Sequence, residues 1–232
     1  MATFLERFEA GAVPSSITRL FGQAELGMGS DAGGNHLVVP EVANAPTTWR
    51  FDALPLSHGV DLRMRLRIPA GATHPGRNFG GGVLQSSSLQ NGYRGGYNPN
   101  PGQQILTYPP GSVLASESGF IVPVGLAWNY RFRISHDPDA DTSVSVQMKS
   151  WVGQVGDEPS AWDLDVAGPN FGPWRAALSV GAQPELHILW YSIGTDGDEA
   201  PVPGSPGTAV SSGVHASAAT GGATAHGTAR AE

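Results

Sequence analysis

The chain has 232 residues, contains no cysteine and carries a formal net charge of −7, from 13 basic and 20 acidic side chains. These values exclude disulfides and thiolate metal sites, and the basic residues are scattered rather than gathered into the cationic stripe that nucleic-acid binding requires. With 32 glycines, 19 prolines and 14% charged residues, the composition favours many turns and few surface helices. We therefore expect an all-β protein.

The sequence also indicates no membrane insertion. No apolar run approaches the roughly 20 residues that a spanning helix requires. The first residues lack a basic stretch followed by a long apolar core, so we predict no secretory signal.

In the N-terminal third, residues 3–9 fit a short strand or a helical turn equally well, and residues 36–39 and 47–51 read as short strands. Residues 27–32 nominally fit a dinucleotide-binding fingerprint. No helical pattern follows them, so we interpret this stretch as a turn.

Residues 60–68 form the next strong strand, because Leu62, Met64 and Leu66 alternate with arginines. The arginines at 63, 65 and 67 share one face, which we interpret as the solvated outer face of a sandwich. A phosphate-binding row is the alternative interpretation of the same three residues.

In the middle of the chain, Asn91-Gly92 predicts a hairpin that folds residues 83–88 back onto residues 93–97. Further short strands are predicted at 105–108, 113–115 and 120–124. Longer alternating strands follow at 126–135, 143–149 and 162–166. The last strands are 174–180 and a continuous apolar run at 187–193, which we expect to be central and covered on both sides.

About a dozen strands at spacings of roughly 8–15 residues predict one β-sandwich or jelly roll over residues 1–200. Residues 201–232 form a different segment, because 22 of the last 29 residues are Gly, Ala, Ser or Thr. Such a composition cannot bury enough surface to offset its own ordering entropy. We predict an extended tail that neighbouring chains hold in place.

No catalytic or cofactor motif stands out. Asp163 and Asp165 share one face of a predicted strand, but they alternate with core-facing residues, so we expect them to face solvent rather than to form the carboxylate pair of a glycosidase. The seven histidines lack zinc-binding spacing. Asp137, Asp139 and Asp141 have the alternating spacing of calcium loops, but the glycine and distal glutamate of such loops are missing. We interpret them as a hairpin turn and expect no enzyme activity, no metal and no cofactor.

Saccharide binding has one candidate site in the sequence. Tyr93 and Tyr97 lie in a glycine-rich stretch that we expect to be exposed, next to Asn98 and Asn100. Exposed aromatic rings stack on sugar rings, and neighbouring amides bind sugar hydroxyls. These four residues therefore form a candidate carbohydrate site.

Several segments resemble the concanavalin A-like, laminin-G-like jelly-roll domains of tailed bacteriophage virion proteins. The likeness covers residues 3–201 and rests on the motifs at 60–67, 81–84, 91–97, 130–133, 146–151, 158–162 and 188–201. In that family the first and last strands pair, which implies that residues 4–8 lie beside residues 188–193. The sequence lacks the carboxylate cluster of the enzymatic branch and the metal loop of the legume-lectin branch.

The resemblance implies a non-enzymatic structural protein of a phage tail or tail tip, rather than a head decoration protein. It would be assembled in the host cytoplasm, in a homo-oligomer or symmetric assembly with other virion proteins. The alternative is a carbohydrate-binding module that recognises glycans of the host cell surface. A glycoside hydrolase, the third possibility, would require two carboxylates about 5 to 10 Å apart in one cleft.

Overall fold

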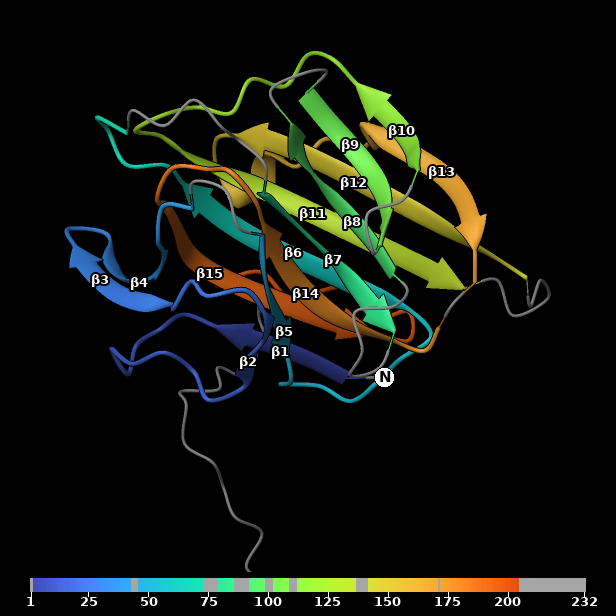
Figure 1. Ribbon diagram of the computed structural model, residues 1–232, viewed down its shortest axis with the longest axis horizontal. Coiled ribbons are helices and arrows are strands. Elements are labelled where there is room, and N and C mark those ends of the chain that lie inside the picture. Colours follow the sequence, from blue (N-terminus) through green and yellow to red (C-terminus); the bar gives the residue numbers. More distant parts are fainter. Residues whose placement is uncertain are drawn as a thin grey trace, which may run out of the picture.

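The structure is a computed structural model that describes residues 2–42, 46–72, 79–85, 92–98, 102–108, 112–136, 142–170 and 172–204. Within these ranges the chain forms two sheets of antiparallel strands packed face to face, so the predicted all-β jelly-roll sandwich is confirmed (Figure 1). One short 3-10 helix, η1 (Val155–Asp157), precedes β13. Among these residues, no helix has the length and apolarity to cross a membrane.

The eight-stranded sheet has the order β13-β12-β11-β6-β15-β4-β3, and β1 also pairs with β15. Its strands are β1 (Ala2–Glu6), β3 (Gly27–Asp31), β4 (Gly34–Val39), β6 (Val60–Arg67), β11 (Ala127–His136), β12 (Ser143–Val152), β13 (Leu164–Pro169) and β15 (Leu186–Thr195). Strand β4 pairs with residues 186–188 of β15, while β1 pairs with residues 191–195. The implied pairing of the first and last strands is thus confirmed.

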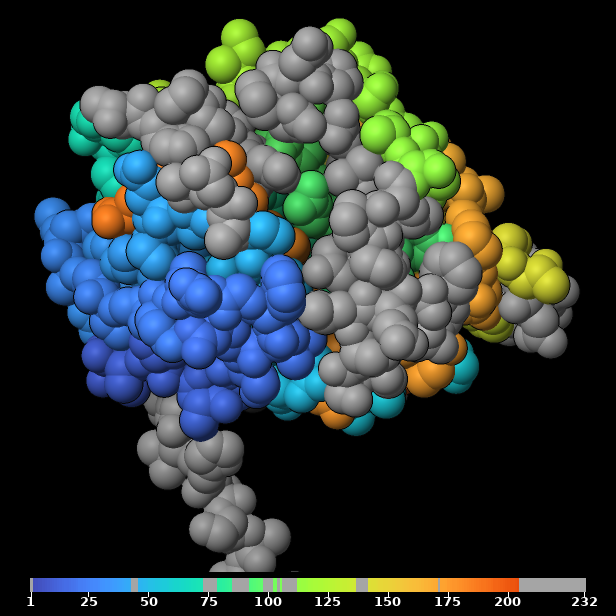
Figure 2. Space-filling view, in the orientation of Figure 1, coloured from blue at the N-terminus to red at the C-terminus, as the bar shows by residue number. Residues whose placement is uncertain are grey.

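The seven-stranded sheet has the order β10-β9-β8-β7-β14-β5-β2. Its strands are β2 (Ile17–Phe21), β5 (Thr47–Phe51), β7 (Phe79–Gln85), β8 (Gly92–Asn98), β9 (Gly102–Tyr108), β10 (Val113–Glu117) and β14 (Trp174–Val180). The pairing of β7 with β8 confirms the predicted hairpin partners. The edge strands β10 and β13 of the two sheets lie side by side, at the right of Figures 1 and 2.

Alternation along the central strands builds the core between the sheets. Leu62 on β6 pairs with Phe132 on β11, and Met64 pairs with Tyr130, so large apolar side chains enter the core in matched rows. All four side chains are fully buried. Because successive residues of a strand point to opposite faces, the arginines of β6 are placed on the outer face of this sheet.

Glycines on the facing sheet make room for these large rings. A Cβ atom at Gly81 would lie 2.7 Å from the Leu62 side chain, and one at Gly95 would lie 2.6 Å from the Phe132 ring. The Tyr130 hydroxyl lies 2.8 Å from the carbonyl oxygen of Gly81 and 2.7 Å from that of Gly95. The glycine-rich strands therefore pack against aromatic side chains inside the sandwich.

Two expectations about secondary structure are wrong. Residues 27–31 form strand β3, which pairs with β4, instead of a turn. The glycines alternate there, and Gly29 leaves space for the His36 ring, since a Cβ atom would lie 2.4 Å from its Nε2. Residues 120–124 form no strand, and only Val124 makes an isolated bridge, to Ile68. Residues 205–232 lie outside the described residues, so the domain boundary at 200 and the extended tail stay predictions.

Candidate functional site

The tyrosines of the predicted carbohydrate site lie in the core. Tyr93 and Tyr97 are only 1% and 2% exposed, so the expectation that they are exposed is wrong. The Tyr93 hydroxyl donates to the carbonyl of Pro169 at 2.5 Å, and burial raises the pKa of Tyr93 to about 12. The Tyr97 hydroxyl shares a hydrogen bond with the Ser150 hydroxyl. Neither ring is available to stack on a sugar.

The spacing of these tyrosines contains the signal for burial. Tyr93, Gly95 and Tyr97 alternate on β8, so the two rings share the face on which Gly95 packs against Phe132. Asn98 ends strand β8, and nothing is described of its side chain, while Asn100 lies outside the described residues. The weak calcium candidates Asp137, Asp139 and Asp141 also lie outside them.

The outer face of the eight-stranded sheet carries a row of three cations. Lys149 on β12 pairs with Arg131 on β11, and Arg131 pairs with Arg63 on β6. Each of these three residues is at most 6% exposed. Like charges on directly opposite residues are destabilising, and burial adds a desolvation cost, so this row requires matching anions. The expected solvated face is therefore wrong at Arg63.

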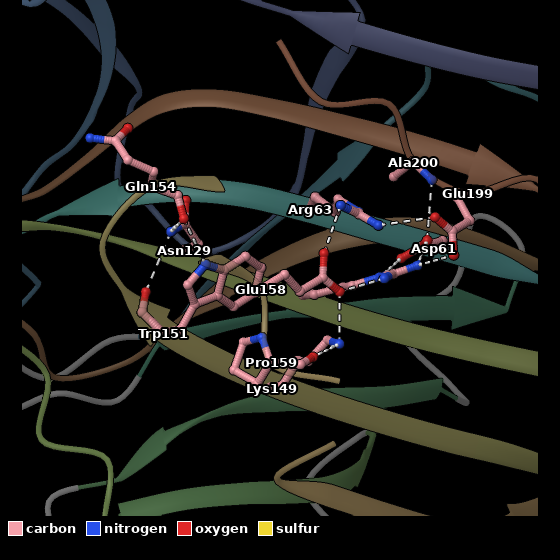
Figure 3. A network of polar contacts seen from close by, with 11 residues as sticks. Asp61, Arg63, Asn129, Lys149, Trp151, Gln154, Glu158, Pro159, Glu199 and Ala200 are labelled. Atoms are coloured by element: carbon pink, nitrogen blue, oxygen red, sulfur yellow. Dashed lines mark hydrogen bonds and ion pairs between the residues drawn. The ribbon is translucent and has the colours of Figure 1, made fainter. Parts of the chain in front are cut away.

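Glu158 supplies one carboxylate to all three cations (Figure 3). Its oxygens lie 2.9 Å from Nη1 of Arg63, 2.6 Å from Nη1 of Arg131 and 2.7 Å from Nζ of Lys149. Burial acts to raise the pKa of Glu158, but the hydrogen bonds from Lys149 and Arg131 outweigh it and hold this pKa below its ordinary value. Glu158 is therefore ionised at neutral pH.

Asp61 is the second anion of the cluster. Its carboxylate accepts two hydrogen bonds from Arg131, at 2.9 Å from Nε and 2.5 Å from Nη2, and a third from the backbone N–H of Ala200 at 3.1 Å. Burial acts to lower the pKa of Arg131, yet the hydrogen bonds to Asp61 and Glu158 raise it overall. Asp61 thereby joins the row of cations to the segment that follows β15.

A separate set of hydrogen bonds fixes the loop that delivers Glu158. The carbonyl of Gly153 accepts from Nη1 of Arg65 at 3.0 Å and from Nδ2 of Asn129 at 3.2 Å. The indole N–H of Trp151 donates to the carbonyl of Gln154 at 3.0 Å (Figure 3). The loop is thus held at its start by the outer face of the sheet and at Glu158 by the cations.

An open depression of about 520 Å³ lies over this cluster. It is lined by the charged residues Arg63, Arg131, Lys149, Glu158 and Glu199, with Val155, Gly156, Pro159, Ser160, Val202 and Pro203 completing its walls. The partly exposed Trp162 borders it, because its ring centroid lies 4.4 Å from Nζ of Lys149 and 5.2 Å from Cζ of Arg131. An aromatic ring therefore contacts two of the cations that line the depression.

A second depression, of about 340 Å³, lies where β6 begins and β11 and β15 end. Of its three acids, Asp196 accepts hydrogen bonds from the Ser57 hydroxyl at 2.6 Å and from the backbone N–H of His58 at 3.3 Å. The rings of His58 and His136 are 5.7 Å apart. Because Asp196 ties two chain segments together, we interpret its carboxylate as a structural group.

Asp31, His36 and His187 form the one group among the described residues with the spacing of metal ligands, since their ligand atoms lie within 4.8 Å of one another. Arg67 already brings a positive charge to this group. Its Nη2 pairs with the Asp31 carboxylate and lies 3.0 Å from Nδ1 of His187, while Nε2 of His187 lies 2.8 Å from Glu185. The guanidinium group thus already contacts Asp31 and His187, two of the three side chains that a metal would need.

No protein-family model matches the chain, and no curated protein matches its sequence. Solved structures of similar fold include peanut lectin with a 9mer peptide, with a TM-score of 0.51 and 9% identity over 83% of this chain and 96% of that one. The exoplasmic/lumenal domain of VIP36, in a Ca²⁺/Man-bound form, has a TM-score of 0.52 and 7% identity over 86% and 92% of the two chains. The metal-free carbohydrate recognition domain of Emp46p has a TM-score of 0.50 and 12% identity over 77% and 88%.

At such low identities the likeness concerns the fold alone. The chain therefore has a concanavalin A-like jelly-roll fold with lectin-like structural neighbours. Three acids, Asp61, Glu158 and Glu199, meet over Arg131, and the sequence pattern does not predict that they do so. They lie 97 and 41 residues apart along the chain, so spacing within one strand gives no sign of their meeting.

Proposed function

We propose that this domain binds a saccharide without chemically changing it, in the depression over Arg63, Arg131 and Lys149. The fold supports the proposal, because the structural neighbours include a carbohydrate recognition domain and a domain solved in a Ca²⁺/Man-bound form. This is the carbohydrate-binding alternative drawn from the sequence, with a different site from the one predicted there.

The observation that carries the proposal is an indole ring in contact with two of the cations that line one open depression. Trp162 offers apolar surface for the face of a sugar ring. Of the cations beside it, Arg131 is held by three ion pairs, and Lys149 by one ion pair and a hydrogen bond to a backbone carbonyl. Polar groups that are already fixed lose little entropy when they bind hydroxyl groups. Small-ligand sites typically combine such surfaces.

The acids of the cluster favour binding over catalysis. A glycosidase needs a carboxylic acid that stays protonated near neutral pH, which requires a raised pKa. The hydrogen bonds from Lys149 and Arg131 instead hold the pKa of Glu158 below its ordinary value. Asp61 is occupied by the guanidinium of Arg131. We therefore propose a non-enzymatic domain.

The phage-tail role rests on the sequence resemblance alone. The neighbours named above are lectins and lectin-like domains, and they lend the virion assignment no support. Assembly with other virion proteins and symmetric oligomerisation stay predictions as well. Binding of a host glycan would be compatible with a virion protein and with a carbohydrate-binding module outside a virion.

A panel of neutral and acidic glycans, probed with wild-type protein, Trp162→Ala and Phe21→Ala, tests the proposal. Phe21 is the matched control, because it is an exposed aromatic residue on edge strand β2 of the other sheet. We expect binding that Trp162→Ala weakens about tenfold, as loss of one ring contact implies, and that Phe21→Ala leaves unchanged. Absence of any bound glycan, or equal binding by both variants, would overturn it.

A further inference from the structure

Glu199 differs from the other acids of the depression. Its side chain is 65% exposed, and its two carboxylate oxygens each contact a different arginine at 3.3 Å, Oε2 with Arg63 and Oε1 with Arg131. Glu158, by contrast, contacts its three cations at 2.6 to 2.9 Å and is 18% exposed. Glu199 is therefore a loosely held carboxylate that spans two buried guanidinium groups.

The cluster retains a positive charge if Glu199 is set aside. Arg63, Arg131 and Lys149 then face two fixed anions, Asp61 and Glu158, which leaves one unmatched cation. In the part of the chain that the structure describes, the buried Nε of Arg63 has no hydrogen-bond partner. The fold thus leaves one hydrogen-bond donor of Arg63 without an acceptor. A buried donor without an acceptor lowers stability.

We propose that the ligand is an acidic saccharide whose carboxylate replaces that of Glu199 between Arg63 and Arg131. This inference rests on the proposed saccharide site and names its ligand class, a sugar chain that contains uronic acid. Guanidinium groups favour the planar, two-oxygen geometry of a carboxylate. The carboxylate of Glu199 already takes this position, since each of its oxygens faces one arginine.

In this arrangement Glu199 is an internal competitor. It follows strand β15, and its exposure allows it to leave the arginines without unfolding the sheet. An exposed ion pair contributes little to stability, so displacement costs little. The sugar ring that carries the incoming carboxylate would then lie beside Trp162, which contacts Arg131.

Calorimetric titration with trigalacturonate and with its methyl ester tests this proposal, because esterification removes the charge of each carboxylate and keeps the same sugar chain. The proteins are wild type, Glu199→Gln and Glu117→Gln, the last being an exposed acid on edge strand β10 of the other sheet. We expect the acid to bind more tightly than the ester. Glu199→Gln should bind the acid roughly tenfold more tightly than wild type, since a repelling charge a few ångströms away is removed.

The ester should show no such gain, and Glu117→Gln should match wild type. If Glu199→Gln were the one protein of the three that bound trigalacturonate, this result would also support the competitor role. Equal binding of acid and ester, unchanged by Glu199→Gln, would overturn the acidic class while leaving saccharide binding in place. If no protein binds either probe, the acidic class is overturned, and the glycan panel decides separately whether the domain binds saccharides.

Discussion

The first and the last arginine of strand β6 have different surroundings, which we call the Arg63 end and the Arg67 end. Arg63 is buried and shares its acids with Arg131 and Lys149, whereas Arg67 is 22% exposed and contacts Asp31 and His187. At the Arg63 end one carboxylate holds three cations. At the Arg67 end one cation holds a carboxylate and a histidine. Alternation places both arginines on the outer face, and segments from elsewhere in the chain decide which end is covered.

The strongest way to break this contrast is to remove the shared carboxylate. Glu158→Gln leaves three buried cations with Asp61 as their remaining well-buried anion. Breaking a buried ion pair costs about 3 to 5 kcal/mol, and because Glu158 keeps some exposure we expect about 3 kcal/mol. The free energy of unfolding from urea titration, at constant m-value, measures this loss.

Asp31→Asn is the matched change at the Arg67 end. It also neutralises a carboxylate that pairs with an arginine of β6, but Asp31 lies at the exposed edge strand. We expect a clearly smaller loss of stability than for Glu158→Gln, since exposed pairs are screened by solvent. Equal losses in the two variants would contradict the difference between the ends.

Arg65 lies between Arg63 and Arg67 on strand β6. Its guanidinium group donates hydrogen bonds to two uncharged groups. Its Nη1 donates to Oδ1 of Asn129 at 2.9 Å and to the carbonyl of Gly153 at 3.0 Å. Arg65→Met should cost about 1 to 2 kcal/mol through these hydrogen bonds. Faster amide hydrogen exchange at residues 153–157, with β4 unchanged, would locate the effect at the loop. Unchanged exchange there would contradict this anchoring role.

The two ends should also lose stability in different pH windows. Burial lowers the pKa of His187 below its ordinary 6.5, so the unfolded chain takes up this proton first and stability falls as the pH drops from 6.5. Glu158 has a pKa below its ordinary 4.5, so its contribution is complete above 4.5 and is lost as the pH falls through its folded value.

Single substitutions separate these two windows. In unfolding titrations from pH 7 to 3, His187→Gln should flatten the slope just below pH 6.5, and Glu158→Gln should flatten the slope below 4.5. The effect of His187→Gln should be the smallest of those predicted here. If His187→Gln flattened the slope below pH 4.5, or Glu158→Gln the slope just below pH 6.5, the assignment of the pKa shifts to the two ends would be contradicted.

The sequence predicts the layers of this fold well, because alternation is a local property. Leu62, Met64 and Leu66 fix the inner face of β6, and the same alternation places Arg63 outside. The site was harder to predict. Arg63 is buried by Glu158 and Glu199, which lie 95 and 136 residues away along the chain, so no local pattern reveals that this arginine is covered.

The predicted tyrosine site failed for a related reason. Glycines usually indicate exposed turns, and on that basis the sequence favours exposure of the stretch around Tyr93 and Tyr97. Here Gly95 instead leaves space for Phe132 from the other sheet. Such a contact depends on how the two sheets are packed together, and alternation along β8 was the only local signal for it.

The most direct test of the account is to map ligand-induced shifts by NMR on ¹⁵N-labelled wild-type protein. A trigalacturonate titration should shift the indole signal of Trp162 and the Nε signals of Arg63 and Arg131, which border or line the depression. The signals of His36 and His187 at the Arg67 end should stay in place. Shifts confined to that end, or to His58 and Asp196, would contradict the proposed site.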